Sequence, residues 1–502
     1  MTKAPHLIVQ ARAGTGKTST MTWALDAVLG NDIPEGIVLS GQQTEIFSAL
    51  CNYPAPESIA FVAFGKSIAK ELQSKVSPPV EASTMHSMGY SAIRDSLGRV
   101  KVNNFKVDNI IEKLTGTTRR RSKNPAIWLA TRKLVSLVKN TLSDDLDRLV
   151  ERFGIDLNGA GSAIYDLVPQ VLEECSKLTR EIDYDDMLWF VVEKDLPVKS
   201  FDLLLVDEAQ DLNRVQQEIA MKVIGDTGRM VLIGDDRQAI YGFRGADSDS
   251  INYMSDVLSD TDRGIQVLPL TVTRRCPKSV VALAQKIVSD IESHEDAPEG
   301  TILYSSAQDA LEGDRSYTEG DMILCRTNAP LCKTAFAIIR QGRKAIIQGR
   351  DIGQGLISLV NKLDQDTVSE LSRELDSFEF SERRRIMGRQ RWSEAQVQSL
   401  EDRCDCIRYL SEGLSRVSKL IQRIKDVFAD VDRDGKPKEA VLLSSVHRAK
   451  GLEARTVWIL HPELLPHPMA KQDWEMDQEQ NIKYVALTRS QDTLVFVKTS
   501  TD

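Results

Sequence analysis

The chain has 502 residues, of which 41% are hydrophobic and 27% are charged. This composition is ordinary for a globular protein, and the length predicts about three domains. The net charge of −9 argues against wholesale electrostatic adhesion to nucleic acid, although binding needs only a local positive channel. No signal pattern and no apolar run of about 18 residues is present, so neither secretion nor membrane insertion is predicted. The seven cysteines are scattered without a Cys-x-x-Cys pair, which argues against a disulfide framework or zinc ribbon and favours a reducing cytoplasm.

The first predicted element is a buried strand at residues 7–9, followed by the glycine-rich sequence ARAGTGKT at residues 11–18. Glycines at the start of a helix let backbone N–H groups crowd around phosphates. Lys17 is placed to meet the β- and γ-phosphates, and Thr18 to ligate magnesium. The predicted nucleotide-binding residues of this loop are Ala13, Gly14, Thr15, Gly16, Lys17, Thr18 and Ser19.

A second buried strand is predicted in the sequence LLLVDEAQD at residues 203–211. Its C-terminal end carries two carboxylates. Asp207 is suited to the outer coordination shell of Mg²⁺, and Glu208 to orienting and deprotonating an attacking water. Together with the glycine-rich loop, this segment predicts nucleotide hydrolysis.

Residues 231–246 begin as a strand and continue as a polar loop. Gln238 is placed to sense a γ-phosphate. Tyr241 and Phe243, followed by Arg244, could stack on unpaired bases, and such stacking is worth roughly 1–3 kcal/mol per base. The alternative is that both aromatic residues belong to the core.

With these segments, the chain resembles the UvrD/Rep-like branch of the superfamily 1 DNA helicases. Residues 59–67 (IAFVAFGKS) are similar to the family's first DNA-contacting motif, and residues 83–89 (STMHSMG) to its Thr-x-His-Ser partner. Residues 444–453 (SSVHRAKGLE) and 484–490 (YVALTRS) resemble the fifth and sixth motifs. The resemblance implies an α/β fold of two RecA-like P-loop domains with parallel sheets, each interrupted by a mainly helical insertion. It also implies ATP and Mg²⁺ as cofactors.

The resemblance implies roles for residues near the C-terminal half. Arg275 and Arg489 would reach the γ-phosphate from the second RecA-like domain and join Lys17, Glu208 and Gln238 as the catalytic set. An arginine supplied in this way raises hydrolysis by about 10³–10⁵-fold; the alternative is that both are solvated surface charges. Glu453 would hold the ribose and Gly451 would let the backbone approach it. The implied nucleic-acid contacts are Phe64, Lys66, Thr84, His86, Tyr241, Phe243, Arg244 and His447, with ordinary structural roles as the alternative for the two histidines.

Three departures from the family pattern concern the base of ATP and the first DNA motif. The glutamine that usually reads the adenine edge upstream of the phosphate loop is missing, and Gln42 or Gln43 could replace it. Arg274 stands where a tyrosine usually stacks on adenine, and a guanidinium plane can also stack. Gly65 stands where asparagine is common, which weakens the assignments of its two neighbours.

The motifs divide the chain into four predicted parts. The first RecA-like domain is expected at residues 1–89 and 201–269, with a helical insertion at 90–200. The second is expected at residues 270–355 and 437–502, with a reduced helical accessory insertion at 356–436. Two basic clusters, at residues 119–123 and 383–391 beside Trp392, either contact nucleic-acid backbone or are solvated.

These features predict a monomer-competent, ATP-driven translocase that acts on single-stranded and tailed duplex DNA, in the cytoplasm and without a membrane partner. The family implies 3′-to-5′ polarity, which the residues themselves do not determine. RNA stays open as a substrate because stacking and phosphate contacts suit any single strand. The alternative, favoured by the reduced accessory region, is a nucleic-acid-gated ATPase that signals to a separate nuclease or repair effector.

Overall fold

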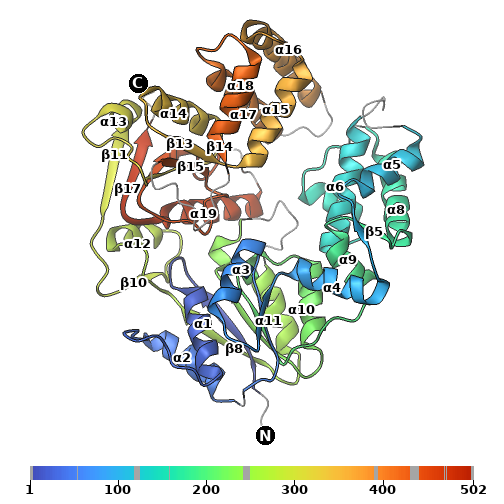
Figure 1. The fold of residues 1–502 in the computed structure, drawn as a ribbon, viewed down its shortest axis with the longest axis vertical. Coiled ribbons are helices and arrows are strands. Elements are labelled where there is room, and N and C mark those ends of the chain that lie inside the picture. The colour runs from blue at the N-terminus through green and yellow to red at the C-terminus, as the bar shows by residue number, and fades with distance from the viewer. Residues whose placement is uncertain are drawn as a thin grey trace. The chain divides into compact units, whose positions relative to one another are not determined.

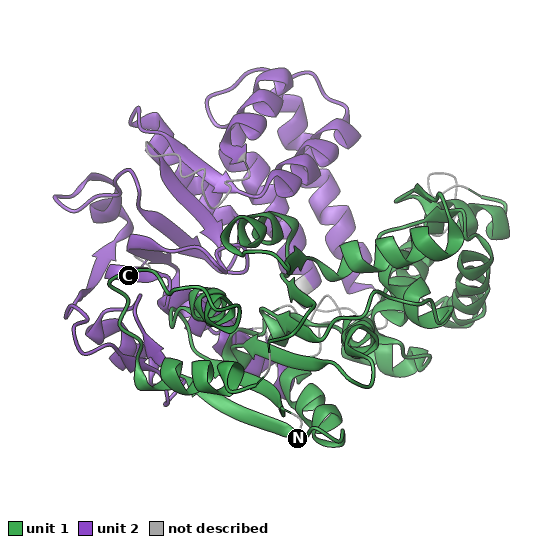
Figure 2. Ribbon diagram, turned by 60° about the horizontal axis from the view of Figure 1, so that its bottom comes forward, with its two compact units in different colours: residues 1–271 green, residues 272–502 purple. Residues whose placement is uncertain are grey.

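The chain folds into two compact units, residues 1–271 and 272–502 (Figure 2). The structure is a computed structural model that describes residues 4–53, 55–117, 125–157, 159–240, 249–388, 394–429, 440–468, 470 and 472–498. Each unit contains one large parallel sheet with helices around it (Figure 1). The predicted α/β class with two parallel sheets, each interrupted by helices, is therefore confirmed.

The sheet of the first unit has six parallel strands. In sheet order they are β3 (Val80–Ser83), β2 (Ile59–Val62), β6 (Leu203–Val206), β7 (Arg229–Gly234), β1 (His6–Ala11) and β8 (Ile265–Leu270). The four central strands are almost continuously buried, as expected when helices cover both faces of a parallel sheet. Because all strands run the same way, their C-terminal ends lie along one edge, which is where ligands bind in such sheets.

Helices cover both faces of this sheet, and alternate side chains of each strand face opposite layers. Leu7 and Val9 pack with the first group of helices, whereas Ile8 packs with the second. The first group is α1 (Lys17–Val28), α2 (Gly41–Cys51) and α3 (Lys66–Lys75). The second group is α4 (Met85–Leu97), α9 (Asp186–Glu193), α10 (Arg214–Ile224) and α11 (Ser250–Ser259).

A mainly helical region lies between α4 and α9 in the chain and has its own core around Trp128 and Phe190. Its elements are β4 (Lys101–Val102), α5 (Lys106–Thr115), α6 (Pro125–Thr141), α7 (Leu146–Arg152), α8 (Gly161–Lys177) and β5 (Glu181–Ile182). Helix α9 joins this region to the sheet, because Phe190 packs in the helical core while Leu188 packs in the sheet core.

The second unit has a sheet of seven parallel strands. In sheet order they are β11 (Thr301–Ser306), β17 (Ser490–Lys498), β16 (Ala454–Leu460), β12 (Met322–Cys325), β15 (Val441–Ser445), β13 (Ala345–Gln348) and β14 (Phe428–Ala429). A short parallel pair, β9 (Val272–Thr273) and β10 (Glu292–Ser293), lies apart from it.

Helices of the second unit fall into two sets. The first set, which alternates with the strands, is α12 (Lys278–Ala284), α13 (Ala307–Glu312), α14 (Ala329–Arg340) and α19 (Asp473–Leu487). The second set lies between β13 and β14 and consists of α15 (Arg350–Leu363), α16 (Val368–Met387), α17 (Glu394–Ser411) and α18 (Val417–Val427). One hydrophobic core includes side chains of this set and of β12 and β13, so the four helices are packed onto the sheet.

The predicted boundaries of the four parts of the chain remain a prediction.

Three short 3₁₀ turns complete the described elements: Ala209–Asp211, Asp236–Gln238 and Pro462–Leu464. Among the described residues, no helix combines the length and apolar character needed to cross a bilayer.

His6, at the start of β1, predicts a pH dependence of the first unit. The residue is 2% exposed and its Nδ1 accepts the backbone N–H of Met230 at 3.0 Å. Burial, together with the charges of Arg263 and Arg229, lowers its pKa from 6.5 to about 4. The unfolded chain therefore takes up the proton first, so stability present above pH 6.5 is lost as the pH falls towards 4.

We expect His6→Asn to remove this loss, because the asparagine oxygen can accept the same N–H without titrating in this range. The measurement is chemical unfolding of wild type and variant between pH 7.5 and about 4.5, where the full His6 contribution is at most about 3 kcal/mol. Parallel pH profiles of the two proteins would show that His6 titrates normally.

Candidate ATP and nucleic-acid sites

The glycine-rich loop joins the end of β1 to the start of α1. Gly14 and Gly16 have φ angles of 72° and 78°, which favour glycine because residues with a Cβ rarely adopt this left-handed backbone conformation. Thr15 is buried and its hydroxyl donates to the carbonyl of Arg12 at 2.9 Å. Ala13 is also buried, while Ser19 is exposed on α1. The loop therefore has the shape in which the first N–H groups of α1 can bind a phosphate.

Two side chains of this loop contact the two carboxylates at the end of β6. The hydroxyl of Thr18 donates to Asp207 Oδ2 at 2.8 Å, and Lys17 Nζ donates to Glu208 Oε2 at 3.2 Å. Burial and the neighbouring Glu208 raise the pKa of Asp207. The hydroxyl and carboxylate oxygens of Thr18 and Asp207 are the ligand type that Mg²⁺ prefers, and both are adjacent to the phosphate loop.

Glu208 has a φ angle of 55°, a conformation that is rare outside glycine and costs of order 1–3 kcal/mol. Its side chain also accepts a hydrogen bond from Gln210 Nε2. Gln210 Oε1 in turn accepts the backbone N–H of Asp235 at 3.0 Å, and Asp235 Oδ2 accepts from Gln238 Nε2 at 2.7 Å. Hydrogen bonds thus connect Lys17, Glu208 and Gln238 through Gln210 and Asp235, for which the sequence predicted no role.

Gln210 lies four residues after the end of the buried strand β6, and Asp235 comes directly after the buried strand β7. Their position after predicted strands, at the C-terminal edge of the sheet, is the sequence signal that could have identified them as candidate site residues. Burial raises the pKa of Asp235, and Lys17 and Arg12 oppose this effect.

The two glutamines considered for adenine recognition already have partners within the first unit. Gln43 forms a capping box with Ser40 and donates to Thr20 Oγ1 at 2.9 Å. Gln42 donates to Thr271 Oγ1 at 2.8 Å and accepts from its N–H at 2.9 Å. To bind an adenine edge, either amide would therefore have to give up hydrogen bonds that it makes within the first unit.

In the second unit, Arg275 forms an ion pair with Glu453, which also accepts from Gln491 Nε2 at 2.9 Å. Burial alone would raise the pKa of Glu453, but Arg275, Arg489 and the hydrogen bond from Gln491 together lower it. Arg489 Nε donates to the carbonyl of Val485 at 2.9 Å. The structure brings Arg275 and Glu453 together within their own unit.

The remaining predicted positions of the second unit are loop residues. Gly451 has a φ angle of 83°, Arg274 is exposed just after β9, and His447 is partly buried just after β15. Several predicted contacts lie outside the described residues: Tyr241, Phe243 and Arg244, the basic run at 119–123, and Arg389, Arg391 and Trp392.

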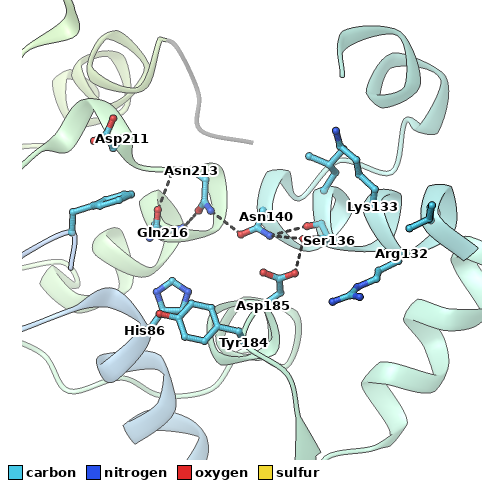
Figure 3. A pocket seen from close by; sticks show the side chains of 13 residues that line it. His86, Arg132, Lys133, Ser136, Asn140, Tyr184, Asp185, Asp211, Asn213 and Gln216 are labelled. Atoms are coloured by element: carbon cyan, nitrogen blue, oxygen red, sulfur yellow. Dashed lines mark hydrogen bonds between the residues drawn. The ribbon is translucent and has the colours of Figure 1, made fainter. Parts of the chain in front are cut away.

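A pocket of about 860 Å³ lies within the first unit, between the sheet edge and the helical region (Figure 3). Phe64, 42% exposed, and His86 line it. Lys66, exposed at the start of α3, is not among its lining residues, and the hydroxyl of Thr84 accepts the Ser87 N–H as the N-cap of α4. Four of the residues predicted to contact nucleic acid are described in this unit, and two of them, Phe64 and His86, line the same pocket.

Tyr184 lines the same pocket and was not selected from the sequence. Its ring stacks on His86 with centroids 4.1 Å apart and an angle of 26° (Figure 3). Burial lowers the pKa of His86 to about 4, although Asp185 opposes the shift, so the ring is neutral near pH 7. Leu129 and Leu137 of α6 also line the pocket. The polar lining residues come from α6, from the turn before α9, from the segment before α10 and from α10 itself: Arg132, Lys133, Ser136, Asn140, Asp185, Asp211, Asn213 and Gln216.

Hydrogen bonds connect the two sides of this pocket. Ser136 Oγ donates to Asp185 Oδ2 at 2.6 Å, and Asn213 Nδ2 donates to Asn140 Oδ1 at 2.8 Å (Figure 3). The pocket therefore combines aromatic faces, two cationic side chains and polar groups on packed helices.

The turn that carries Tyr184 and Asp185 is held by buried charges. Asp186 is bound by Lys106 and by Lys139, at 2.7 Å from each, and Lys139 also binds Asp183 at 2.9 Å. Burial alone would lower the pKa of Lys139, but the two aspartates outweigh burial and raise it. Asp183 and Asp186 are thus paired with buried lysines, while Tyr184 and Asp185 between them line the pocket.

A family model for the UvrD/REP helicase N-terminal domain matches residues 2–258. The chain is 22% identical to the ATP-dependent DNA helicase PcrA of Staphylococcus epidermidis over 628 residues, covering 99% of this chain and 81% of the relative. It is 20% identical to PcrA of Bacillus subtilis over 631 residues, covering 97% and 80%. DNA helicase II of Escherichia coli is 32% identical over 91 residues, which are 18% of this chain and 12% of the relative.

Proposed function

Because the chain belongs to the UvrD/REP helicase family, we propose that it hydrolyses ATP to move along single-stranded DNA and separate the duplex ahead. The observation that carries the proposal is the contact of Lys17 with Glu208 and of Thr18 with Asp207 at one sheet edge. Membership in the family makes the chain an enzyme that uses ATP and acts on DNA. Polarity, the catalytic residues and the form of the DNA belong to the proposal.

In this proposal the first unit binds the phosphates of ATP. The N–H groups at the start of α1 and the Lys17 ammonium bind the phosphate oxygens. Thr18 and Asp207 would hold Mg²⁺, and the bound ion would supply positive charge to the phosphate oxygens. Glu208 accepts a proton from the attacking water, and Gln238 contacts the terminal phosphate.

The second unit contributes the groups that the family resemblance assigns to it. Arg275 and Arg489 stabilise the charge on the departing phosphoryl group, since a guanidinium presents fixed donors to several oxygens. Glu453 contacts the ribose and Arg274 the adenine face. A 3′-to-5′ direction and a cytoplasmic location complete the proposal.

The pocket of Figure 3 would receive a base of the single strand. Phe64, Tyr184 and neutral His86 offer aromatic faces, and Arg132 and Lys133 offer positive charge for the backbone. Stacking and phosphate contacts do not distinguish bases, which fits an enzyme that must pass over any sequence.

The test is ATP hydrolysis by wild type and Lys17→Ala, each with and without single-stranded DNA. We expect DNA to stimulate the wild type strongly, and the variant to hydrolyse little ATP in either condition because it lacks the phosphate-binding ammonium. Wild-type hydrolysis that does not respond to DNA would contradict the proposal.

An unwinding assay on duplexes with a 3′ or a 5′ single-stranded tail then shows whether the protein separates strands and in which direction it moves. Unwinding of the 3′-tailed duplex alone is the expected result. Stimulated hydrolysis without unwinding of either duplex would favour the second candidate, a nucleic-acid-gated ATPase that signals to an effector. The observation behind that candidate is the small accessory set of helices α15–α18.

A further inference from the structure

Arg12 lies inside the phosphate loop but does not point to solvent. Only 8% of the residue is exposed. Its Nη1 donates to Asp236 Oδ1 at 2.6 Å, to Asp235 Oδ1 at 3.3 Å and to the carbonyl of Ala11 at 3.1 Å. The arginine therefore joins the loop after β1 to the turn after β7.

The turn after β7 carries Gln238. Asp235 is fully buried and binds Arg12 with one carboxylate oxygen and Gln238 Nε2 with the other. Gln238 is itself 4% exposed. A single buried carboxylate thus sits between Arg12 and the amide assigned to the terminal phosphate.

The phosphate loop reaches this network at two points. Lys17 contacts Glu208, which is connected to Asp235 through Gln210, and Arg12 contacts Asp235 directly. Hydrogen bonds between charged groups are roughly twice as strong as neutral ones, and in a buried network they fix geometry closely. A shift of the loop would therefore move the turn that bears Gln238.

We propose that Arg12 is a positioning residue that acts on ATP hydrolysis through Asp235, Asp236 and Gln238. It sets the distance between the phosphate loop and the Gln238 amide. The inference rests on the proposed function, because it assigns Arg12 a part in the same reaction. Lysine would keep the charge but not the planar guanidinium, from which a single nitrogen, Nη1, reaches both carboxylates.

The test is a double-mutant cycle between Arg12→Gln and Gln238→Ala, read as DNA-stimulated kcat and KM for ATP. In the wild-type background, Arg12→Gln is expected to lower kcat about 10- to 100-fold, the size of effect that misplaced groups produce. In the Gln238→Ala background it should lower kcat less than about twofold, because residues that act as a unit are not additive. The KM for ATP should change far less than kcat.

Equal reductions in both backgrounds would overturn the inference, as would a Gln238→Ala variant with wild-type kcat. Arg12→Lys should recover part of the lost kcat, and Arg94→Gln on the surface of α4, where the Arg94 side chain is 60% exposed, is the matched control. If Arg12→Gln fails to fold, Asp236→Asn takes its place in the cycle, since that side chain is 44% exposed. A wild type without ATP hydrolysis would instead refute the proposed function, so the two failures are distinguishable.

Discussion

ATP turnover by the Glu208→Gln variant is expected to fall about 10²- to 10³-fold, a loss typical of removing one preorganised electrostatic group. Glutamine has nearly the same shape but no negative charge, so it cannot take a proton from water. The phosphate loop, Lys17 and Thr18 are unchanged, so ATP binding should persist. Steady-state hydrolysis with saturating single-stranded DNA, together with binding of a fluorescent ATP analogue, measures both effects.

The geometry of Glu208 explains why a small chemical change should have a large effect. Its strained backbone, Lys17 and Gln210 together fix the carboxylate beside the phosphate loop. A fixed group needs little reorganisation during the reaction, and its loss cannot be replaced by a mobile neighbour.

Glu112→Gln on the exposed surface of α5 makes the same chemical change away from the site and should keep wild-type turnover. Lys17→Ala should differ from Glu208→Gln by losing nucleotide affinity as well as turnover. Near wild-type hydrolysis by Glu208→Gln would show that another group serves as the base.

Lys139→Met is expected to destabilise the helical region of the first unit by about 3–5 kcal/mol. The Lys139 side chain is 1% exposed and binds Asp183 and Asp186, so its removal leaves buried negative charge without full compensation. Protection of amide hydrogens in α6 and α9 from exchange, measured by mass spectrometry on the full chain, reports this local stability.

Two variants in the same region serve as controls. Adding Asp183→Asn to Lys139→Met removes the excess charge and should recover much of the protection, since Lys106 and Asp186 still form a pair. Lys113→Met breaks the exposed pair with Glu174, where the Lys113 side chain is 71% exposed, and should cost far less stability than Lys139→Met because water screens this pair. Equal losses for Lys113→Met and Lys139→Met would contradict the role given to the buried network.

The candidate ATP site was largely predictable from sequence because its residues lie next to one another in short segments. Lys17 and Thr18 begin α1, and Asp207 and Glu208 follow β6 directly. Parallel strands place such segments on one edge, so their meeting follows once the strands are recognised. Gln210 and Asp235 were not selected because their function depends on the partners of their side chains.

The candidate nucleic-acid pocket was less predictable. Phe64 and His86 were selected within motifs, but Tyr184 comes from a turn between β5 and α9, nearly one hundred residues after His86. No periodicity or local motif in the sequence predicts that the rings of His86 and Tyr184 stack. Only the packing of α4 against α9 brings them together.

The sequence by itself determined the strand-end motifs, because each consists of residues adjacent along the chain. The family resemblance built on those motifs implied the class of the fold and predicted phosphate binding by the loop. The tertiary structure decided which side chains share a hydrogen-bond network. Arg12 illustrates the difference: its place in the loop suggested no partner, yet folding brings it to Asp235 and Asp236, more than two hundred residues away. Such contacts depend on strand order and side-chain packing, which local sequence patterns do not specify.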